Sequence, residues 1–295
     1  MVQPTIDPVR IKQQQRVTWD AVSVGWEAST DLFERYAAQV TRHLLAAGGV
    51  GPGQAVLDVG TGLGEPALSA ARLVGPRGRV LGIDLAPAMV EAARRRAAGM
   101  PNVEYAVADV EDGDRLPAGP FDVALSRWGL MFAVDHVAAF RAIARLLVPG
   151  GVLAAAVWGP PPAAPIVAFS FAAVSQRLQL PPPPPGLPGP FSMADPAQLA
   201  AEVRAAGFVD VTVEEVMVPF RFASVAEYTG FSRAITPPGL LDTIRERTGD
   251  AGDPATWRAV GEAARERFAD GDGLLLRSTA LCLRATTPRA ASPAA

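Results

Sequence analysis

Short apolar runs alternate with segments of helical periodicity through the middle of the chain. Before the last of these runs, Phe140, Ile143 and Leu147 recur at a spacing that places them on one face of a helix. Other helices are expected from about Glu65 and over 87–98. The apolar runs, which predict strands, cover 55–59, 78–84, 102–109, 120–126 and 150–158. Nearly continuous apolar strands that alternate with helices are typical of a parallel sheet with helices on both faces.

The pattern extends beyond this region in both directions. Residues 9–47 have helical periodicity, with Trp19 and Trp26 on one face. Residues 194–208 predict a helix that Asp195 caps at its N-terminus. Two more strands are expected at 209–222 and 273–286, the first of them parallel to the earlier strands. The pattern therefore predicts a Rossmann-like, doubly wound, seven-stranded and mainly parallel sheet, with helices on both faces and a helical lid.

Composition and charge narrow the classes of protein that fit this fold. Hydrophobic residues make up 49% of the 295 residues, and the formal net charge is -3. Because no dense basic tract is present, nucleic acid is not expected as a partner. No window approaches the ~20 apolar residues of a membrane span, so stable membrane insertion is not expected. The single cysteine, Cys282, allows no internal disulfide and fits a cytoplasmic location, and no residue cluster has metal-ligand spacing.

The stretch VLDVGTGLGEPAL, at 56–68, places a glycine-rich turn between a strand and a helix. Such a turn holds nucleotide-like cofactors in α/β proteins. A dinucleotide-binding turn has the spacing G-x-G-x-x-G, but Glu65 stands where its third glycine would be. In addition, Asp58, Asp84 and Asp109 lie at the ends of the first three strands, where carboxylates can accept hydrogen bonds from ribose hydroxyls and an adenine amino group. The combination favours an adenosyl group without a pyrophosphate.

At these motifs the sequence resembles the class I S-adenosylmethionine-dependent methyltransferases, nearest to their ubiquinone/menaquinone C-methyltransferase-like branch. The resemblance covers about residues 54–158 and extends to the later stretch PGPFSMADPAQLAAEVRAAGF. The stretches that carry it are VLDVGTGLGEPAL, VLGIDLAPAMVEAARRRA, VEYAVADVEDGDRLP, FDVALSRWGLMF and ARLLVPGGVLAAAVW. It implies S-adenosylmethionine as the cofactor and methyl transfer as the activity.

The resemblance also assigns positions around the cofactor. It places the glycines of the turn at the methionine part, the acid after the second strand at the ribose and the acid after the third at the adenine amino group. Met89 and Val110 would flank adenine, while Ser126 and Arg127 would line the methyl-donor end. An alternative is that the acids after the first and third strands only cap turns. The full set of expected cofactor-binding residues is Asp58, Gly60, Thr61, Gly62, Gly64, Asp84, Leu85, Met89, Asp109, Val110, Ser126 and Arg127.

Segments added around this core are expected to form the lid. Parallel sheets bind ligands beyond the carboxyl ends of their strands, and the segments after the fifth and sixth strands leave from that edge. In the plainest family members the last connection is a short hairpin, so this chain departs from them by an addition. The expected division is an N-terminal helical lid segment 1–50, an S-adenosylmethionine-binding core 51–158, a proline-rich apolar cap segment 159–192, a core helix and sixth strand 193–222, a helical cap insertion 223–272, a seventh strand 273–287 and a disordered tail 288–295.

The lid residues favour a lipophilic small molecule as the methyl acceptor. The segment 159–192 is apolar and carries a single charge, Arg177. A pocket built from such side chains would suit a quinone-like, phenolic, terpenoid or polyketide skeleton, methylated at carbon or oxygen. The alternative is that these side chains pack the lid on itself or form a homodimer interface. The expected acceptor-binding residues are Trp19, Trp26, Trp128, Met131, Phe169 and Tyr228.

His136 is the expected general base for an acceptor that must lose a proton. It follows Asp135 at the start of the helix after the fourth strand, near the ligand-binding edge. Its alternative role is that of an exposed residue in the first turn of that helix. Two other classes of function stay open: a nicotinamide-dependent oxidoreductase, which the position of Glu65 disfavours, and a non-catalytic protein that binds an adenosyl ligand.

Overall fold

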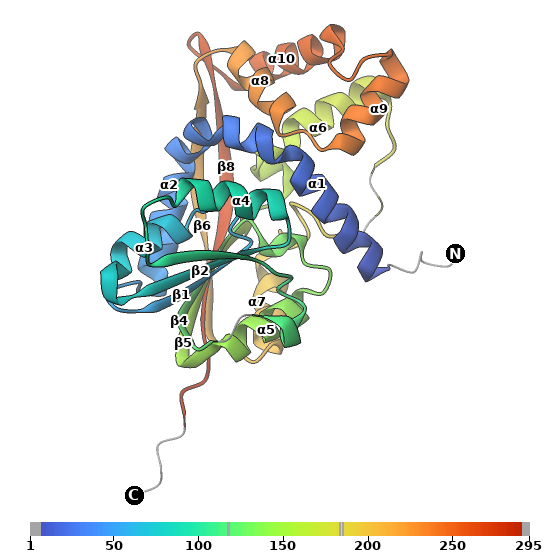
Figure 1. The fold of residues 1–295 in the computed structure, drawn as a ribbon. Coiled ribbons are helices and arrows are strands. Elements are labelled where there is room, and N and C mark those ends of the chain that lie inside the picture. The colour runs from blue at the N-terminus through green and yellow to red at the C-terminus, as the bar shows by residue number, and fades with distance from the viewer. Residues whose placement is uncertain (1–6, 117–118, 183, 185, 291–295) are drawn as a thin grey trace, which may run out of the picture.

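The computed structural model describes residues 7–116, 119–182, 184 and 186–290. Its centre is a sheet with the strand order β3-β2-β1-β4-β5-β8-β6, and the short β7 pairs with β8 (Figure 1). The described strands are β1 (Ala55–Val59), β2 (Arg79–Asp84), β3 (Val103–Val107), β4 (Phe121–Arg127), β5 (Leu147–Trp158), β6 (Val209–Phe222), β7 (Ala269–Asp270) and β8 (Gly273–Thr286). Among the described strands only β8 departs from the parallel direction, because it runs antiparallel to β5, β6 and the short β7. The predicted seven-stranded, mainly parallel sheet is confirmed.

Helices cover both faces of the sheet, as the alternating pattern predicted (Figure 1). One face carries α2 (Thr30–Gly48), α3 (Ala67–Val74) and α4 (Pro87–Arg96), and the other carries α5 (His136–Leu146) and α7 (Pro196–Ala205). In α2 the buried side chains Phe33, Ala37, Val40 and Leu44 recur every three or four positions and form the stripe that faces the sheet. Removing this stripe from water is the main reason that α2 stays on the sheet.

Capping residues fix where two of these helices begin. The carboxylate of Asp195 accepts hydrogen bonds from the backbone N–H groups of Ala197 and Gln198, so the predicted cap of α7 is confirmed. Asp135 caps α5 in the same way through the N–H of Ala138. The expected helical region 9–47 is two helices, because the chain bends at Ser29 between α1 (Pro8–Ala28) and α2.

Four helices gather beyond the carboxyl ends of β5 and β6, in the segments expected to contribute to the lid (Figure 1). They are α6 (Pro165–Leu178), α8 (Val225–Ala234), α9 (Pro238–Thr248) and α10 (Pro254–Phe268). We refer to these four helices as the cap. Phe169 of α6 packs edge-on against Phe268 of α10 at 4.8 Å, which joins the two added segments to each other.

Short single-turn 3-10 helices complete the described elements: η1 (Gly75–Arg77), η2 (Gly113–Arg115), η3 (Leu130–Phe132) and η4 (Pro161–Ala163). No helix in the described part of the chain is long and apolar enough to cross a membrane. The disorder expected for the tail 288–295 concerns residues that, from 291 on, lie outside the described ranges.

Candidate functional site

The turn after β1 is held by backbone contacts with the end of β2. Gly60, Gly62 and Gly64 all have positive φ angles, of 66°, 53° and 102°, which side-chain-bearing residues rarely adopt. The N–H groups of Gly60 and Thr61 donate to the carbonyl of Ile83, at 2.8 and 3.0 Å. The three glycines of the motif therefore allow a tight turn at the carboxyl edge of the sheet, where the sequence placed it.

Two of these glycines have different surroundings. A Cβ atom on Gly60 would lie 2.8 Å from the Cα of Gly129, in the loop after β4. A Cβ on Gly62 would have no atom of the described chain within 4 Å. Gly60 is thus required by close packing of two backbone segments, whereas Gly62 faces open space, as a turn that receives a cofactor would.

Asp84 connects the glycine turn to the start of α4. One carboxylate oxygen accepts the N–H of Gly62 at 2.8 Å, and the other accepts the N–H of Ala86 at 2.9 Å. Burial raises the pKa of Asp84, although these two hydrogen bonds act in the opposite direction. Leu85, between Asp84 and Ala86, is half-buried. Since each oxygen of a carboxylate has two lone pairs, Asp84 can still accept hydrogen bonds from ribose hydroxyls.

Asp58 has an internal role in the same turn. It is fully buried, and one oxygen accepts hydrogen bonds from the Thr61 hydroxyl at 2.6 Å and the Ala67 N–H at 3.1 Å. Its other oxygen has no hydrogen-bond partner in the described chain. Burial raises the pKa of Asp58 to about 7. Asp58 and Thr61 therefore tie the end of β1 to the start of α3, next to the open side of the turn.

Asp109 lies beneath the N-terminal helix. One of its oxygens accepts the N–H of Glu111 at 2.9 Å, and the other forms an ion pair with the Nζ of Lys12 in α1 at 2.8 Å. The same ammonium lies 3.3 Å from Glu111. Burial alone would lower the pKa of Lys12, but the two acids outweigh it and raise that pKa. This contact was not predicted from the sequence. The one feature that could have indicated it is that Lys12 is the only lysine of the chain.

The helix α1 packs over the residues expected to flank the cofactor. Val22 is buried against Ala86 and Met89 of the α4 region, and Trp19, Trp26 and Leu63 pack around the same cluster. Trp19 also contacts Phe132 of η3, edge-on at 4.9 Å. Met89 is thus covered by α1, while Val110 is partly buried against the main core. Trp19 and Trp26, which are expected to bind the acceptor, thus lie beside Met89, which is expected to flank adenine.

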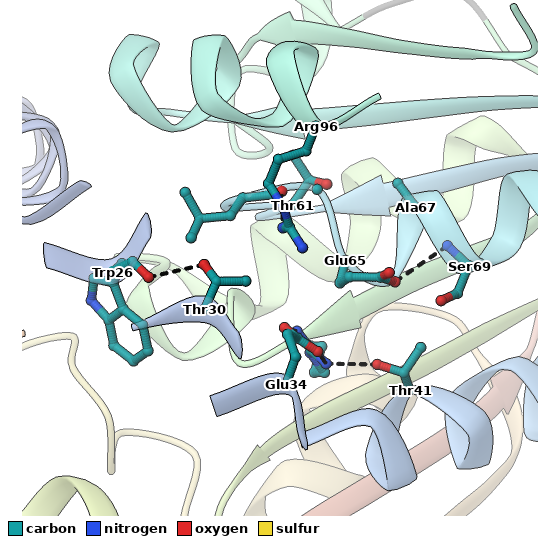
Figure 2. Close-up of polar contacts among 12 residues, drawn as sticks. Trp26, Thr30, Glu34, Thr41, Thr61, Glu65, Ala67, Ser69 and Arg96 are labelled. Carbon is teal, nitrogen blue, oxygen red and sulfur yellow. Dashed lines mark hydrogen bonds and ion pairs between the residues drawn. The ribbon is translucent and has the colours of Figure 1, made fainter. Parts of the chain in front are cut away.

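The end of β4 presents Ser126 and Arg127 in different ways. Ser126 is fully buried, and its hydroxyl has no partner in the described chain. Arg127 donates to Glu34 at 2.9 Å and to the Thr41 hydroxyl at 2.6 Å, and a second contact makes the pair with Glu34 bidentate. Figure 2 shows Glu34 and Thr41 of α2 across from Thr61 and Glu65 of the glycine turn. Because Glu34 lies far from β4 in the sequence, no local pattern indicated the pair.

An aromatic cluster extends from the end of β4 to the cap. Trp128 has a positive φ of 60° and stacks on Trp158 with ring centroids 4.2 Å apart. Further ring contacts lead through Phe33 to Trp26 and, by way of Phe231 and Phe222, to Tyr228. Trp26, Trp128 and Tyr228 are therefore brought together indirectly, through one cluster.

The remaining predicted acceptor residues make other contacts. The backbone carbonyl of Met131 accepts hydrogen bonds from the Gly189 N–H and the Ser192 hydroxyl, which attaches the proline-rich segment to η3. Phe169 packs within the cap, in the arrangement that the sequence left open as the lid packing on itself. His136 is paired through its Nδ1 with Glu202 of α7 at 2.9 Å, so its described contact joins two helices.

Buried polar atoms without partners collect where ligands are expected. At the strand ends they are one oxygen of Asp58, the Ser126 hydroxyl and the Trp128 Nε1. Most buried polar groups in proteins are hydrogen-bonded. A set of buried polar atoms without partners at one edge of the sheet therefore indicates a ligand that is not part of the chain. Together with the open side of Gly62 and the carboxylate of Asp84, the Asp58 oxygen and the Ser126 hydroxyl fit the methionine and ribose parts of S-adenosylmethionine.

Comparison with known proteins agrees with this geometry. Residues 56–151 match a family model described as a methyltransferase domain. Aklanonic acid methyltransferase DauC of Streptomyces sp. (strain C5) is 39% identical over 104 residues, which cover 35% of this chain and 47% of that protein. Nocamycin O-methyltransferase of Saccharothrix syringae is 35% identical over 189 residues, covering 58% and 65%. The chain thus spans about half to two thirds of the length of these relatives.

Solved structures share the whole architecture. The [4+2]-cyclase SpnF superimposes with a TM-score of 0.55 at 22% identity, over 92% of this chain and 98% of that one. This likeness concerns the fold alone. Residues 56–151 therefore form a methyltransferase domain, and its glycine turn with Asp84 is the candidate site for S-adenosylmethionine.

Proposed function

We propose that this protein transfers the methyl group of S-adenosylmethionine to carbon or oxygen of a lipophilic small molecule. The observation that carries the proposal is the meeting of two features at one edge of the sheet. The glycine turn with Asp84 supplies a cofactor site, and the aromatic cluster from Trp128 to Tyr228 begins directly beside it. The relatives described above are named as an aklanonic acid methyltransferase and a nocamycin O-methyltransferase, which supports a small-molecule acceptor for this protein.

The cofactor supplies an electrophilic methyl group when bound, so the protein has mainly to bind, orient and exclude water. Asp84 would hold the ribose, the open face of Gly62 would receive the methionine part, and Asp109 would accept from adenine. Fixing two reactants in line can contribute ~7–11 kcal/mol to lowering the barrier. The cover formed by α1 and the cap would keep water from the reacting atoms.

Two buried donors in the aromatic cluster support an acceptor that carries oxygen atoms. The indole N–H of Trp128 has no hydrogen-bond partner in the described chain, and the hydroxyl of Tyr228 lies near the hydroxyls of Ser170 and Ser232. Tyr228 is fully buried, and burial raises its pKa to about 12, so its hydroxyl stays protonated and can donate. Each donor would pair with a carbonyl, ether or hydroxyl oxygen of the acceptor, while the surrounding rings contact its apolar skeleton.

His136 remains the proposed general base for an acceptor with an acidic proton. The carboxylate of Glu202 lies beside its Nδ1, which favours the tautomer that carries the proton there and leaves the lone pair on Nε2 free to accept one. A cytoplasmic location, the absence of a nucleic-acid partner and a homodimer remain predictions. The alternative to be distinguished from methyl transfer is a non-catalytic protein that binds an adenosyl ligand.

The test uses S-adenosylmethionine with a radiolabelled methyl group, incubated with the protein and a fractionated bacterial metabolite extract. Label in an organic-phase fraction, lost in an Asp84→Ala control that remains folded, is the expected result. Label that enters only aqueous fractions would overturn the lipophilic acceptor. Binding of the cofactor without transfer to any fraction would favour the non-catalytic rival. Competition by NAD for the same site would favour the oxidoreductase.

A further inference from the structure

We infer that Lys12 is a positioning residue that latches the N-terminal helix over the bound cofactor, so that cofactor exchange requires its ion pairs to open. The inference rests on the proposed cofactor site. Lys12 makes no contact with the glycine turn itself. It acts on the acids that follow β3 and, through them, on the helix that covers the site.

The Lys12 ammonium joins three elements at the adenine end of the site. It pairs with Asp109 at 2.8 Å and with Glu111 at 3.3 Å. Glu111 in turn accepts the backbone N–H groups of Val134 and Asp135, at 3.0 and 2.8 Å, where α5 begins. One cation from α1 therefore holds the loop after β3, which is itself bonded to the loop after β4.

The rest of α1 closes the same edge. The carboxylate of Asp20 accepts the N–H of Ala88 at 2.9 Å, which caps the start of α4 beside Asp84. Farther along the helix, Glu27 pairs with Arg95 of α4 at 2.8 Å. The same helix also makes apolar contacts: Trp19 packs against Phe132, and Val22 packs against Met89. A cofactor held by both Asp84 and Asp109 would lie under this helix.

Lys12 is placed where a latch has most effect on opening. The chain bends at Ser29, so α1 can move as a lever about that point. At 1.5 Å per helical residue, Lys12 lies roughly 25 Å along the helix from the bend. Its side chain is 24% exposed and those of Asp109 and Glu111 are 23% and 9% exposed, so the pairs are partly shielded from screening by salt.

The kinetic test measures dissociation of S-adenosylhomocysteine by stopped flow in Lys12→Met, Lys12→Arg and the wild type. Arg16→Met is the matched control, because Arg16 is an exposed basic residue of the same helix with no ion pair in the described chain. We expect S-adenosylhomocysteine to dissociate about fivefold faster from Lys12→Met, Lys12→Arg to restore most of the difference, and Arg16→Met to match the wild type. An unchanged dissociation rate in Lys12→Met would overturn the latch.

A second readout needs no bound cofactor. Because Lys12 is the only lysine, an amine-acetylating reagent has two targets, Lys12 and the α-amino group, and mass spectrometry can follow both. Relative to the α-amino group, Lys12 should react several-fold more slowly in the folded protein than in urea, and more slowly again with S-adenosylhomocysteine. Equal rates in folded and unfolded protein would exclude the ion pairs. Slow reaction without any effect of S-adenosylhomocysteine, in a protein that does not bind it, would instead count against the proposed function.

Discussion

At the residue scale, Gly62 and Gly60 would respond differently to the same substitution. Gly62→Ala adds a methyl group in open space, so its effect on folding should be limited to the strain of the positive φ, about 1 kcal/mol. The methyl would project into the volume proposed for the cofactor, and affinity for S-adenosylmethionine should fall at least about tenfold. Urea unfolding and titration calorimetry would measure the two effects separately.

Gly60→Ala is the control for this prediction. Its new methyl would meet the backbone of Gly129 at 2.8 Å, so it should destabilise the fold more than Gly62→Ala does. If Gly62→Ala binds S-adenosylmethionine as the wild type does, the open side of the turn is not the cofactor site.

The buried carboxyl of Asp58 predicts a pH dependence of stability. Its pKa is raised by burial from the usual 3.8 to about 7 in the folded protein, so between these values the folded state binds more protons than the unfolded state. The contribution of Asp58 is therefore fully present below about pH 4 and is lost as the pH rises through 7, by at most roughly 1.4 kcal/mol per pH unit. Urea unfolding between pH 5 and 8 should show a smaller decline in Asp58→Asn than in the wild type. Parallel curves for the two proteins would contradict the raised pKa.

The sequence predicted the positions of the acids better than their contacts. Spacing placed Asp58, Asp84 and Asp109 at the ends of neighbouring strands, because parallel strands bring their carboxyl ends to one edge. It could not show that Asp58 is internal to the turn, nor that Asp109 is paired with Lys12. Those contacts depend on how the turn closes and on where α1 lies, which local patterns do not determine.

At the element scale, the pair of Arg127 with Glu34 holds α2 to the end of β4. The Arg127 side chain is 6% exposed, so loss of one partner leaves a charge in a poorly solvated place. Glu34→Gln should therefore lower the free energy of unfolding by about 3 kcal/mol.

The double variant Arg127→Met, Glu34→Leu is the control for this effect, because it removes both charges at once. It should recover most of the lost stability, as urea unfolding would show. If the double variant lost as much stability as Arg127→Met and Glu34→Leu lose together as single variants, the two charges would act independently of each other.

The limits of helix prediction have a similar cause. Periodicity found the helical region 9–47 but not the bend at Ser29, because the pattern of apolar positions continues across it. Capping residues were informative at Asp195, where the polar side chain and the following proline coincide. A helix boundary could therefore be predicted where a capping residue marks it, but not where tertiary packing determines it, as at Ser29.

At the scale of the whole molecule, the cap and the cofactor site are predicted to act on different ligands. Phe268→Ala removes the contact of α10 with Phe169 of α6, which loosens the cap, while the glycine turn lies elsewhere. Transfer of label to the organic fraction should fall several-fold, with the calorimetric affinity for S-adenosylmethionine unchanged within about twofold. Phe171→Ala, at an exposed position of α6, should leave both unchanged. Equal losses of binding and transfer in Phe268→Ala would mean that the cap supports the cofactor site.

The topology of the molecule was predictable in outline. The alternation of strands and helices and the sixth and seventh strands specified the sheet, since few connections satisfy the rules for parallel strands. The contacts between α1, α6 and α8 to α10 were not predictable, because a helix with an apolar face can pack against its neighbours in several ways.

The pairing of β6 with β8 has a consequence for how such a protein can diversify. Phe222, where the chain leaves the sheet for α8, is the register partner of Leu274, close to where the chain returns. The two junctions of the insertion are therefore as close as the ends of a hairpin. An insertion of any length that begins and ends there leaves the hydrogen-bond ladder intact. This position can therefore accept an exchange of one inserted segment for another by recombination, while the methyltransferase domain is inherited unchanged.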